Sequence, residues 1–474
     1  MATVGPASEA PEVLAAMIGA GMTAARISLS HGSLDEALAR LARLRRVAAE
    51  AGTHTGVLAD LPGPKVRTCP FPEDGARLLG GAPVDLVVGD EADPSTAGTI
   101  AVAHPGVVET LAPGDRVLLG DGGIELLVVA EGSRRARCEV VSGGLATGRP
   151  GLALPPGRVE LSSPTHEDLR LLEVLAEHDV DAVAISFVRS GADIDRARDH
   201  VGPGGPMLVA KIETQEAVDA LEEIVATGDA VMVARGDLGL RCRLEDVPHH
   251  QKRIIRTGVA YGRQVITATQ MLESMVRSPT PTRAEVSDVA NAVFDGTSAL
   301  MLSGETAVGR DPVAAVATMA RVAARAEREF DYEGWGRSVG RQQHAEARGY
   351  PMPQRITSAI SAAAWRATND ADVAAIIACT EGGSTPRAIS RFRPTVPLLA
   401  ATPSPRTARQ LSMGWGIEAV VVDRQSTTDD IVWFAVAAAA ERGVVRTGDL
   451  VAVLVGSPAE PEPATDTLRL VRVR

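Results

Sequence analysis

Short apolar runs recur along the first 300 residues, and each ends at a polar residue and is followed by a segment with helical periodicity. Repeated strand, loop and helix units of this kind are typical of parallel α/β proteins. Eight runs predict a (β/α)₈ TIM barrel, in which chemistry gathers at the carboxyl ends of the strands. The runs are Ala2–Val4, Thr23–Ser30, Thr55–Asp60, Ala182–Ser186, Met207–Glu213, Ala230–Asp237, Gln264–Thr269 and Ser298–Ser303.

From about Cys69 to Pro156 the series is interrupted by Gly- and Pro-rich sequence with short alternating stretches. Short strands joined by tight turns predict a small β-barrel inserted into the larger barrel. We therefore expect residues 1–68 and 157–340 to form the large barrel and residues 69–156 to form the insert. The clearest alternating stretches are Val117–Leu119, Ile124–Val129 and Arg137–Val141.

The end of the chain follows a third pattern. After the end of a helix near Glu327, the sequence predicts a polar connector near Glu333–Tyr350. Residues 350–474 then alternate apolar runs with helices, which predicts a doubly wound α/β domain. Its predicted strands are Val373–Cys379, Pro397–Ala401, Ile417–Val422 and Leu450–Val455.

Composition excludes several classes of function. The 474 residues are 45% hydrophobic but only 3% aromatic, and the net charge is −12. Such a surface repels nucleic acid and anionic membranes, although a local basic pocket can still hold phosphate. The four cysteines form no Cys-x-x-Cys pair, and we find neither a leader pattern nor a long uninterrupted apolar run. We expect a cytoplasmic protein with no nucleic-acid or membrane partner and no zinc or disulfides.

Lysine is rare, because only three of the 48 basic residues are lysine: Lys65, Lys211 and Lys252. Lysine is a compact point charge and arginine a broad planar fork, so the lysines indicate places where only a point charge fits. Lys211 closes one predicted strand, and Lys65 lies shortly after another. Lys252 falls in a helical pattern, where we expect a solvated side chain.

Lys211 and Glu213 are two residues apart on a predicted strand, so both side chains should point into the barrel mouth. Asp237, at the end of the next strand, should face Glu213. Two carboxylates with room for water and substrate oxygens suit Mg²⁺. The alternative is a structural ion pair with Asp237 capping a helix, and the pattern alone favours that alternative.

Arg26, Ser28 and Ser30 alternate along another strand and are followed by His31 and Gly32. An arginine beside hydroxyls and a glycine turn predicts a cradle for phosphate or carboxylate. A polar helix cap explains the same residues equally well.

Two further sites have the same ambiguity. Thr269 ends a strand, where a threonine is more often a helix cap than a catalytic group. The loop Cys379–Thr385 follows an apolar run and opens a helix. A phosphate pocket and a helix cap both explain that loop.

Taken together, these stretches resemble pyruvate kinases. The resemblance follows the family order over nearly the whole chain, and the long central motifs are specific. It implies a barrel, an inserted lid and a carboxyl-terminal regulatory domain. The motifs are Thr3–Ser8, Ala25–Gly32, Gly63–Thr68, Lys211–Glu213, Met232–Gly239, Ala268–Met275, Pro281–Glu285, Asp288–Ala292 and Met301–Thr306.

The resemblance implies phosphoryl transfer from phosphoenolpyruvate to ADP, giving pyruvate and ATP in the last step of glycolysis. Lys211 would then stabilise the transferred phosphoryl group and the enolate. Glu213 and Asp237 would hold Mg²⁺, with Mn²⁺ as a substitute. Thr269 also lies where the family protonates the enolate. The residues implied at the substrate are Arg26, Ser186, Gly236, Asp237 and Thr269.

By the same resemblance, Arg67, His31 and Arg149 are nucleotide-side residues. The resemblance also implies a homotetramer and a phosphorylated effector in the last domain. The effector phosphate would contact Thr380, Gly383, Ser384 and Thr385.

Two departures from the family pattern bear on activity. The potassium pocket would contain Ser28, Ser30 and Asp60, but Lys65 stands where potassium-dependent members carry glutamate. We interpret Lys65 as a built-in monovalent cation, so that K⁺ is not required. In the lid, Pro150 replaces a usual lysine, and Arg149 is one residue away. An alternative function is therefore a catalytically weak paralogue that binds phosphorylated metabolites as a regulatory or assembly protein.

Overall fold

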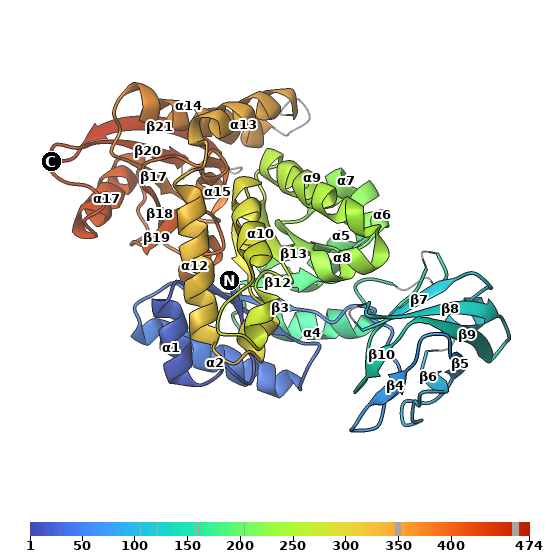
Figure 1. Ribbon diagram of the computed structural model, residues 1–474. Helices are drawn as coiled ribbons and strands as arrows, with labels where there is room; N and C mark the ends of the chain where they lie inside the picture. Colours follow the sequence, from blue (N-terminus) through green and yellow to red (C-terminus); the bar gives the residue numbers. More distant parts are fainter. Residues whose placement is uncertain are drawn as a thin grey trace.

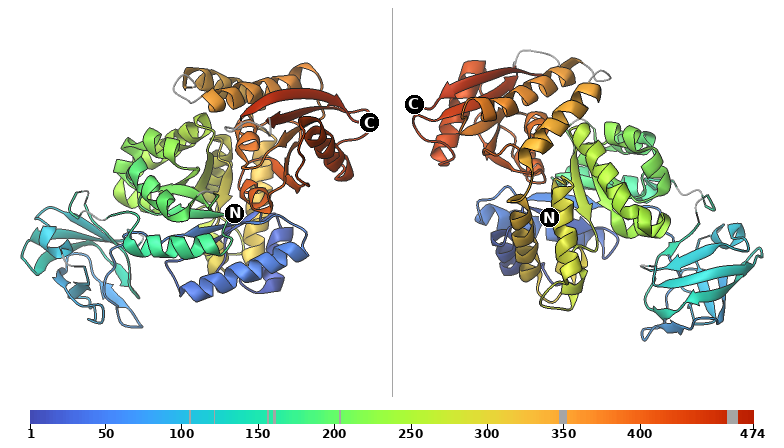
Figure 2. Two further views of the ribbon diagram at one scale, coloured as in Figure 1. Left: turned by 180° about the vertical axis from the view of Figure 1, so that it is seen from behind. Right: turned by 45° about the horizontal axis from the view of Figure 1, so that its top comes forward.

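The computed structural model describes residues 1–104, 106–120, 122–155, 157–159, 162–202, 204–346, 352–456 and 464–474. For residues 343–346 it describes the backbone and not the side chains. A parallel barrel occupies the middle of the molecule (Figure 1). A smaller set of strands projects from one side of the barrel, and the carboxyl-terminal domain packs on another side (Figure 2). No helix in the described ranges is long and apolar enough to cross a membrane.

The central barrel is an eight-stranded parallel sheet in the order β1-β2-β3-β12-β13-β14-β15-β16. Ala2 pairs with Leu302, and the Thr3 N–H donates to the Leu302 carbonyl at 3.0 Å, so the two end strands are joined. The strands confirm the predicted runs except at 235–237, which begin a helix. They are β1 Ala2–Thr3, β2 Ala24–Ser28, β3 Gly56–Asp60, β12 Ala182–Ile185, β13 Met207–Ile212, β14 Ala230–Ala234, β15 Gln264–Ala268 and β16 Ala299–Met301.

Helices surround this barrel and bury their apolar faces against it. Several begin at capping boxes, which satisfy free backbone N–H groups; Ser33 with Glu36 and Thr282 with Glu285 are two examples. The helices are α1 Pro11–Gly19, α2 Leu34–Glu50, α4 His166–Glu177, α5 Gly191–Val201, α6 Gln215–Asp219, α7 Leu221–Thr227, α8 Arg235–Arg241, α9 Val247–Ala260, α10 Arg283–Phe294, α11 Gly304–Ala307 and α12 Pro312–Glu327.

The insert contains a six-stranded sheet in the order β11-β7-β8-β9-β5-β6 and a separate β10-β4 pair. Residues 67 and 68 bridge Gly151 and Val102, which links the two edges of the larger sheet into the predicted small barrel. Pro156, the predicted boundary, lies outside the described residues. The elements are β4 Ala76–Leu78, β5 Pro83–Val88, β6 Thr99–Val102, α3 Val107–Thr110, β7 Arg116–Leu119, β8 Ile124–Ala130, β9 Arg135–Ser142, β10 Gly144–Ala146 and β11 Leu152–Ala153.

The last domain is a five-stranded sheet in the order β19-β18-β17-β20-β21, covered by helices. Four strands match the prediction, and the antiparallel edge strand β21 was not predicted. The elements are α14 Met352–Asp370, β17 Ala375–Cys379, α15 Ser384–Ser390, β18 Leu398–Thr402, α16 Pro405–Leu411, β19 Ile417–Val421, α17 Thr428–Glu441, β20 Leu450–Gly456 and β21 Thr465–Arg472.

The predicted polar connector near Glu333–Tyr350 is wrong for most of its length. Helix α13 covers Tyr332–Glu346, and residues 347–350 lie outside the described ranges. The Trp335 indole N–H donates to the Arg391 carbonyl at 2.8 Å, and its ring packs edge-on against Phe330 at 5.5 Å. These tertiary contacts stabilise a helix that the polar sequence alone does not predict.

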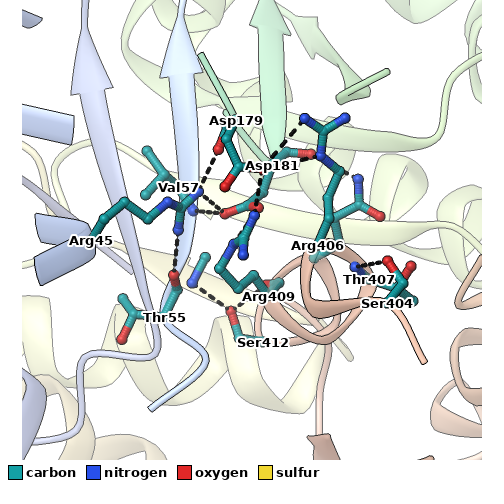
Figure 3. Close-up of polar contacts among 12 residues, drawn as sticks. Arg45, Thr55, Val57, Asp179, Asp181, Ser404, Arg406, Thr407, Arg409 and Ser412 are labelled. Atoms are coloured by element: carbon teal, nitrogen blue, oxygen red, sulfur yellow. Dashed lines mark hydrogen bonds and ion pairs between the residues drawn. The ribbon is translucent and has the colours of Figure 1, made fainter. Parts of the chain in front are cut away.

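A polar cluster joins the underside of the barrel, where its strands begin, to α16 (Figure 3). The fully buried Asp181 carboxylate accepts hydrogen bonds from Arg45 at 2.6 Å, Arg409 at 2.8 Å and the Val57 N–H at 2.7 Å. Arg409 also donates to Asp179 at 2.7 Å. The carboxyl-terminal domain is thereby attached to the end of the barrel opposite the mouth.

Candidate active site

Lys211 lies at the mouth of the barrel, near the carboxyl end of β13, and its side chain is almost fully buried. Its ammonium is 2.9 Å from Glu213 Oε1, 3.1 Å from Asp60 Oδ1 and 2.6 Å from Ser186 Oγ. The shared direction of Lys211 and Glu213 agrees with the two-residue period of a strand. Asp60 and Ser186 come from the neighbouring strands β3 and β12, so three strand ends meet at one lysine.

Opposing charges keep Lys211 and Asp60 ionised. Burial alone would lower the pKa of Lys211, but the carboxylates of Asp60 and Glu213 outweigh burial and raise it. Burial would likewise raise the pKa of Asp60, but Lys211 and Arg26 hold it below its ordinary value. The lysine therefore remains a cation at neutral pH.

Arg26 shares the Asp60 carboxylate with Lys211. Its Nε donates to Asp60 Oδ2 at 2.7 Å, and its Nη1 donates to Thr3 Oγ1 at 3.3 Å. The guanidinium is only partly buried, so it retains donors that can face a ligand. Arg26 and Lys211 thus bring two cationic side chains to one carboxylate, and both cations can face an anionic substrate.

Glu213 has the properties expected of a metal ligand. Its Oε2 accepts the Phe187 N–H at 2.7 Å, and its buried Oε1 lies 2.9 Å from the Lys211 ammonium. The pKa of Glu213 lies above its ordinary value. Burial and the negative charge of Asp237 raise it by more than the positive charge of Lys211 lowers it. Among the described residues no group of three His, Cys, Asp or Glu side chains is arranged to hold a metal. A two-carboxylate site completed by water and substrate fits Mg²⁺.

Gly236 and Thr269 are in direct contact. The Gly236 N–H donates to Thr269 Oγ1 at 2.7 Å, and this hydroxyl donates to the Ala268 carbonyl at 2.6 Å. Thr269 has φ = +68° and Gln270 has φ = +53°. A β-branched residue rarely adopts this left-handed conformation, so the surrounding structure must hold it.

Arg235 holds this turn, and the sequence analysis did not single it out. It donates to the Thr269 carbonyl at 2.7 and 3.2 Å and to the Gln270 carbonyl at 3.3 Å. Asp288 on α10 anchors the guanidinium at 2.8 Å. The only sequence signal was its position directly before Gly236 and Asp237.

The residues predicted to lie on the nucleotide side form a basic region beside the site. Burial lowers the pKa of His31, and the positive charges of Arg67, Arg26 and Lys65 lower it further, so these cations lie close to the imidazole. Arg67 donates to the Arg149 carbonyl at 3.2 Å, which links the barrel to the lid.

The structure brings only part of the predicted monovalent-cation pocket together. The Ser30 N–H donates to Ser28 Oγ at 3.4 Å, and Asp60 is shared by Arg26 and Lys211. Lys65 is not paired with Asp60; its ammonium lies 3.4 Å from Asp237 Oδ1. The side chain thus faces the predicted metal ligand in this structure.

The predicted effector loop lines a cavity of about 340 Å³ in the carboxyl-terminal domain. The Gly383 N–H donates to Thr380 Oγ1 at 2.9 Å, and the hydroxyls of Thr385 and Thr465 are hydrogen-bonded. Ser384 opens α15 and lines the same cavity. Residues 457–463, between β20 and β21, lie outside the described ranges.

Comparison with known proteins gives a consistent result. The family model described as "Pyruvate kinase, barrel domain" matches residues 1–316, and that described as "Pyruvate kinase, alpha/beta domain" matches residues 358–471. A pyruvate kinase of Clostridium acetobutylicum is 37% identical over 471 residues, covering 99% of this chain and 98% of the relative. Pyruvate kinase 2 of a Synechocystis species is 38% identical over 480 residues, covering 100% of this chain and 79% of the relative.

Proposed function

The chain belongs to the pyruvate kinase family, and we propose that the cluster around Lys211 is the place where it transfers a phosphoryl group. Its substrates are phosphoenolpyruvate and ADP, and it is a phosphotransferase that requires a divalent metal. Full-length similarity to curated pyruvate kinases does not favour a paralogue without turnover.

Lys211 carries the electrostatic part of the reaction in this proposal. Its ammonium is permanently charged and fixed by three partners, so it needs no reorganisation when negative charge develops on the departing enolate oxygen and the phosphoryl oxygens. Arg26 contributes a second cation, whose exposed donors would grip the phosphoryl group. Asp60 holds both cations in place.

Glu213 and Asp237 are the proposed Mg²⁺ ligands, and the charge of Asp237 acting on the buried Glu213 carboxylate supports this assignment, because a cation would relieve that repulsion. When bound, the ion would neutralise substrate charge and act as a template for the reactants. Mn²⁺, which also prefers oxygen ligands, would substitute.

The Gly236 and Thr269 pair would orient the substrate carboxylate. Both groups sit at the barrel mouth, and Arg235 fixes the turn that presents the threonine hydroxyl. The same hydroxyl would deliver a proton to the enolate through water. Ser186, which bonds Lys211, would complete this side of the site.

Arg67, His31 and Arg149 would contact ADP from the barrel and the lid. Lid closure would bring Arg149 over the nucleotide phosphates, with Pro150 beside it. The positive charge around His31 supports a phosphate-binding role.

We further propose that the enzyme does not require K⁺. Lys65 supplies a monovalent cation beside the site, and its pairing with Asp237 places that charge at the edge of the predicted metal site. Ser28, Ser30 and Asp60 would then not need to coordinate an external ion.

We also propose that the protein is a cytoplasmic homotetramer and that a phosphorylated ligand regulates it by binding at Thr380, Gly383, Ser384 and Thr385. Edge strand β21 supports association of carboxyl-terminal domains, because an edge strand offers unpaired backbone groups and Leu470 on it is 47% exposed. Analytical ultracentrifugation tests the tetramer, and an activity screen with sugar and nucleoside monophosphates tests the effector.

The deciding experiment measures pyruvate formation from phosphoenolpyruvate and ADP in a buffer free of K⁺, Na⁺ and NH₄⁺. We expect turnover that depends on added Mg²⁺ before any KCl is present. Lys65→Glu should make the enzyme KCl-dependent, with Lys252→Glu as the control. Activity that appears only after KCl would refute the role of Lys65, and failure of Glu213→Gln to weaken Mg²⁺ activation would refute the metal assignment.

A further inference from the structure

A small cavity of about 20 Å³ lies between the underside of the barrel and the carboxyl-terminal domain. Four arginines line it: Arg263 from the barrel and Arg387, Arg391 and Arg393 from α15 and the residues after it. Among the described residues that line the cavity none is acidic. The cavity belongs neither to the proposed active site nor to the proposed effector site.

Arg387 reaches this cavity from α15. Its Nη2 donates to the Gly382 carbonyl at 3.0 Å and contacts the Met207 sulfur at 3.6 Å, whereas its buried Nε has no hydrogen-bond partner. Within the described part of the chain no carboxylate lies within ion-pair distance of it. Burial lowers the pKa of Arg387 to about 10, although distant Asp229 acts in the opposite direction. Asp229 is already paired with Arg198 at 3.3 Å.

Gln264 faces the cavity from the start of β15 and is only 4% exposed. Neither its amide nitrogen nor its amide oxygen has a hydrogen-bond partner. A Cβ placed on Gly414 would lie 2.6 Å from the amide nitrogen, so that nitrogen faces the carboxyl-terminal domain across the junction. Burying an amide without a hydrogen-bond partner costs free energy, so a ligand that accepts a hydrogen bond from the amide nitrogen would be favoured at this position.

Arg393 lines the same cavity, and Glu327 is the carboxylate that acts most on its charge. Arg393 donates to the Thr297 carbonyl at 2.6 Å and lies over the Phe330 ring at 4.4 Å. The carbonyl accepts a hydrogen bond from the Arg393 guanidinium and the ring attracts its positive charge, but neither partner carries a negative charge that would neutralise it. The described lining of the cavity thus contains arginine side chains and no carboxylate, which favours an anion over a cation.

We propose that this cavity binds one compact inorganic anion of halide size, held by the guanidinium of Arg387 and the amide nitrogen of Gln264. The volume sets the size class, because a space of about one water molecule admits a halide and excludes a phosphate ester. The anion bridges two domains, since Gln264 belongs to the barrel and Arg387 to the carboxyl-terminal domain. Its binding stabilises their docking by mass action.

The direct test is diffraction from crystals of the full chain grown in NaBr, with data collected at the bromine absorption edge. We expect an anomalous peak between Arg387 and Gln264. Bromide peaks at surface arginines with none in this cavity would overturn the proposal and leave ordinary water as the occupant.

A second test uses thermal unfolding in sodium chloride and in sodium gluconate at equal ionic strength, because gluconate is too large for the cavity. Chloride should raise the Tm of the full chain by about 2 °C. Arg387→Met should remove that difference, and Gln264→Leu should reduce it. Arg472→Met changes an exposed arginine of the same domain and should leave the difference intact. An equal chloride effect in all variants would show general salt stabilisation and refute the site.

Discussion

The Gly236 N–H and the Thr269 hydroxyl are 2.7 Å apart at the mouth of the barrel, and the threonine that accepts this bond has a left-handed backbone. We propose that both groups orient the substrate carboxylate, and their hydrogen bond to each other holds them in position before the substrate binds. The Thr269 hydroxyl is also the group that we propose delivers a proton to the enolate.

Thr269→Val keeps the shape of the side chain and removes the hydroxyl. We expect kcat to fall by about 100-fold, because the proton path to the enolate is lost and the Gly236 N–H loses its acceptor. Thr269→Ser keeps the hydroxyl and should remain within about 10-fold of the wild type. Steady-state kinetics separates kcat from KM, and equal losses in the two variants would contradict the role of the hydroxyl.

Arg235 is a positioning residue for the same turn. Arg235→Lys keeps the charge but cannot reach the Thr269 and Gln270 carbonyls and Asp288 at once. We expect kcat to fall by about 10-fold or more, with a smaller change in KM for ADP. Arg243→Lys, on an exposed loop nearby, is the control. A parallel loss of Tm and activity without a kinetic split would indicate a purely structural role.

Lys211→Met removes the central charge with little change in volume. We expect kcat to fall by at least about 100-fold. The Tm should also fall, because Asp60 and Glu213 would face each other without the cation between them. Lys252→Met tests the effect of losing a surface lysine. Near-normal turnover in Lys211→Met would contradict the assigned role.

Asp181 and Asp179 form a matched pair at the underside of the barrel, since both accept from Arg409. Asp181 is fully buried, and Asp181→Ala should lower the free energy of unfolding by about 3–5 kcal/mol. The Asp179 side chain is 56% exposed, so Asp179→Ala should cost less than about 1 kcal/mol. Urea titrations measure both values, and equal losses would contradict the role of burial.

Glu285 connects the loop after Thr269 to the start of α10. Burial would raise its pKa, but hydrogen bonds from Ser274 and Thr282 outweigh burial and hold the pKa below 4.5. A lowered pKa means that its stabilisation is complete above about pH 4.5 and is lost as the pH falls through the folded-state value. Glu285→Gln should therefore cost about 1–2 kcal/mol at pH 7. The difference from the wild type should shrink in urea titrations as the pH falls through the lowered folded-state pKa, and a difference that stays constant down to acid pH would contradict the prediction.

Strand periodicity was sufficient to predict the barrel and the shared direction of Lys211 and Glu213. It could not predict that Asp60 and Ser186 meet Lys211, because the contacts depend on which strands are neighbours and on their register. The rotamer of Lys65, which pairs with Asp237, is likewise not encoded in a local pattern.

Other features depend on tertiary contacts that sequence spacing does not contain. Helix α13 is polar and is stabilised through Trp335, and β21 pairs with β20 across residues outside the described ranges. The sequence places Arg235 at a strand-to-helix turn, where an arginine has no special meaning. Its role depends on the left-handed backbone of Thr269, which only the structure shows. Local pattern predicts elements, and non-local geometry assigns the partners of each side chain.

The pairing of β1 with Leu302 limits when the barrel can close while the chain is being synthesised. About 300 residues must leave the ribosome before the two end strands of the barrel can meet. The lid contains its own short-range strand pairs and can fold while the barrel is still open. The unclosed barrel exposes strand edges during that interval, so this stretch of translation is when the chain is most exposed to aggregation and most dependent on chaperones.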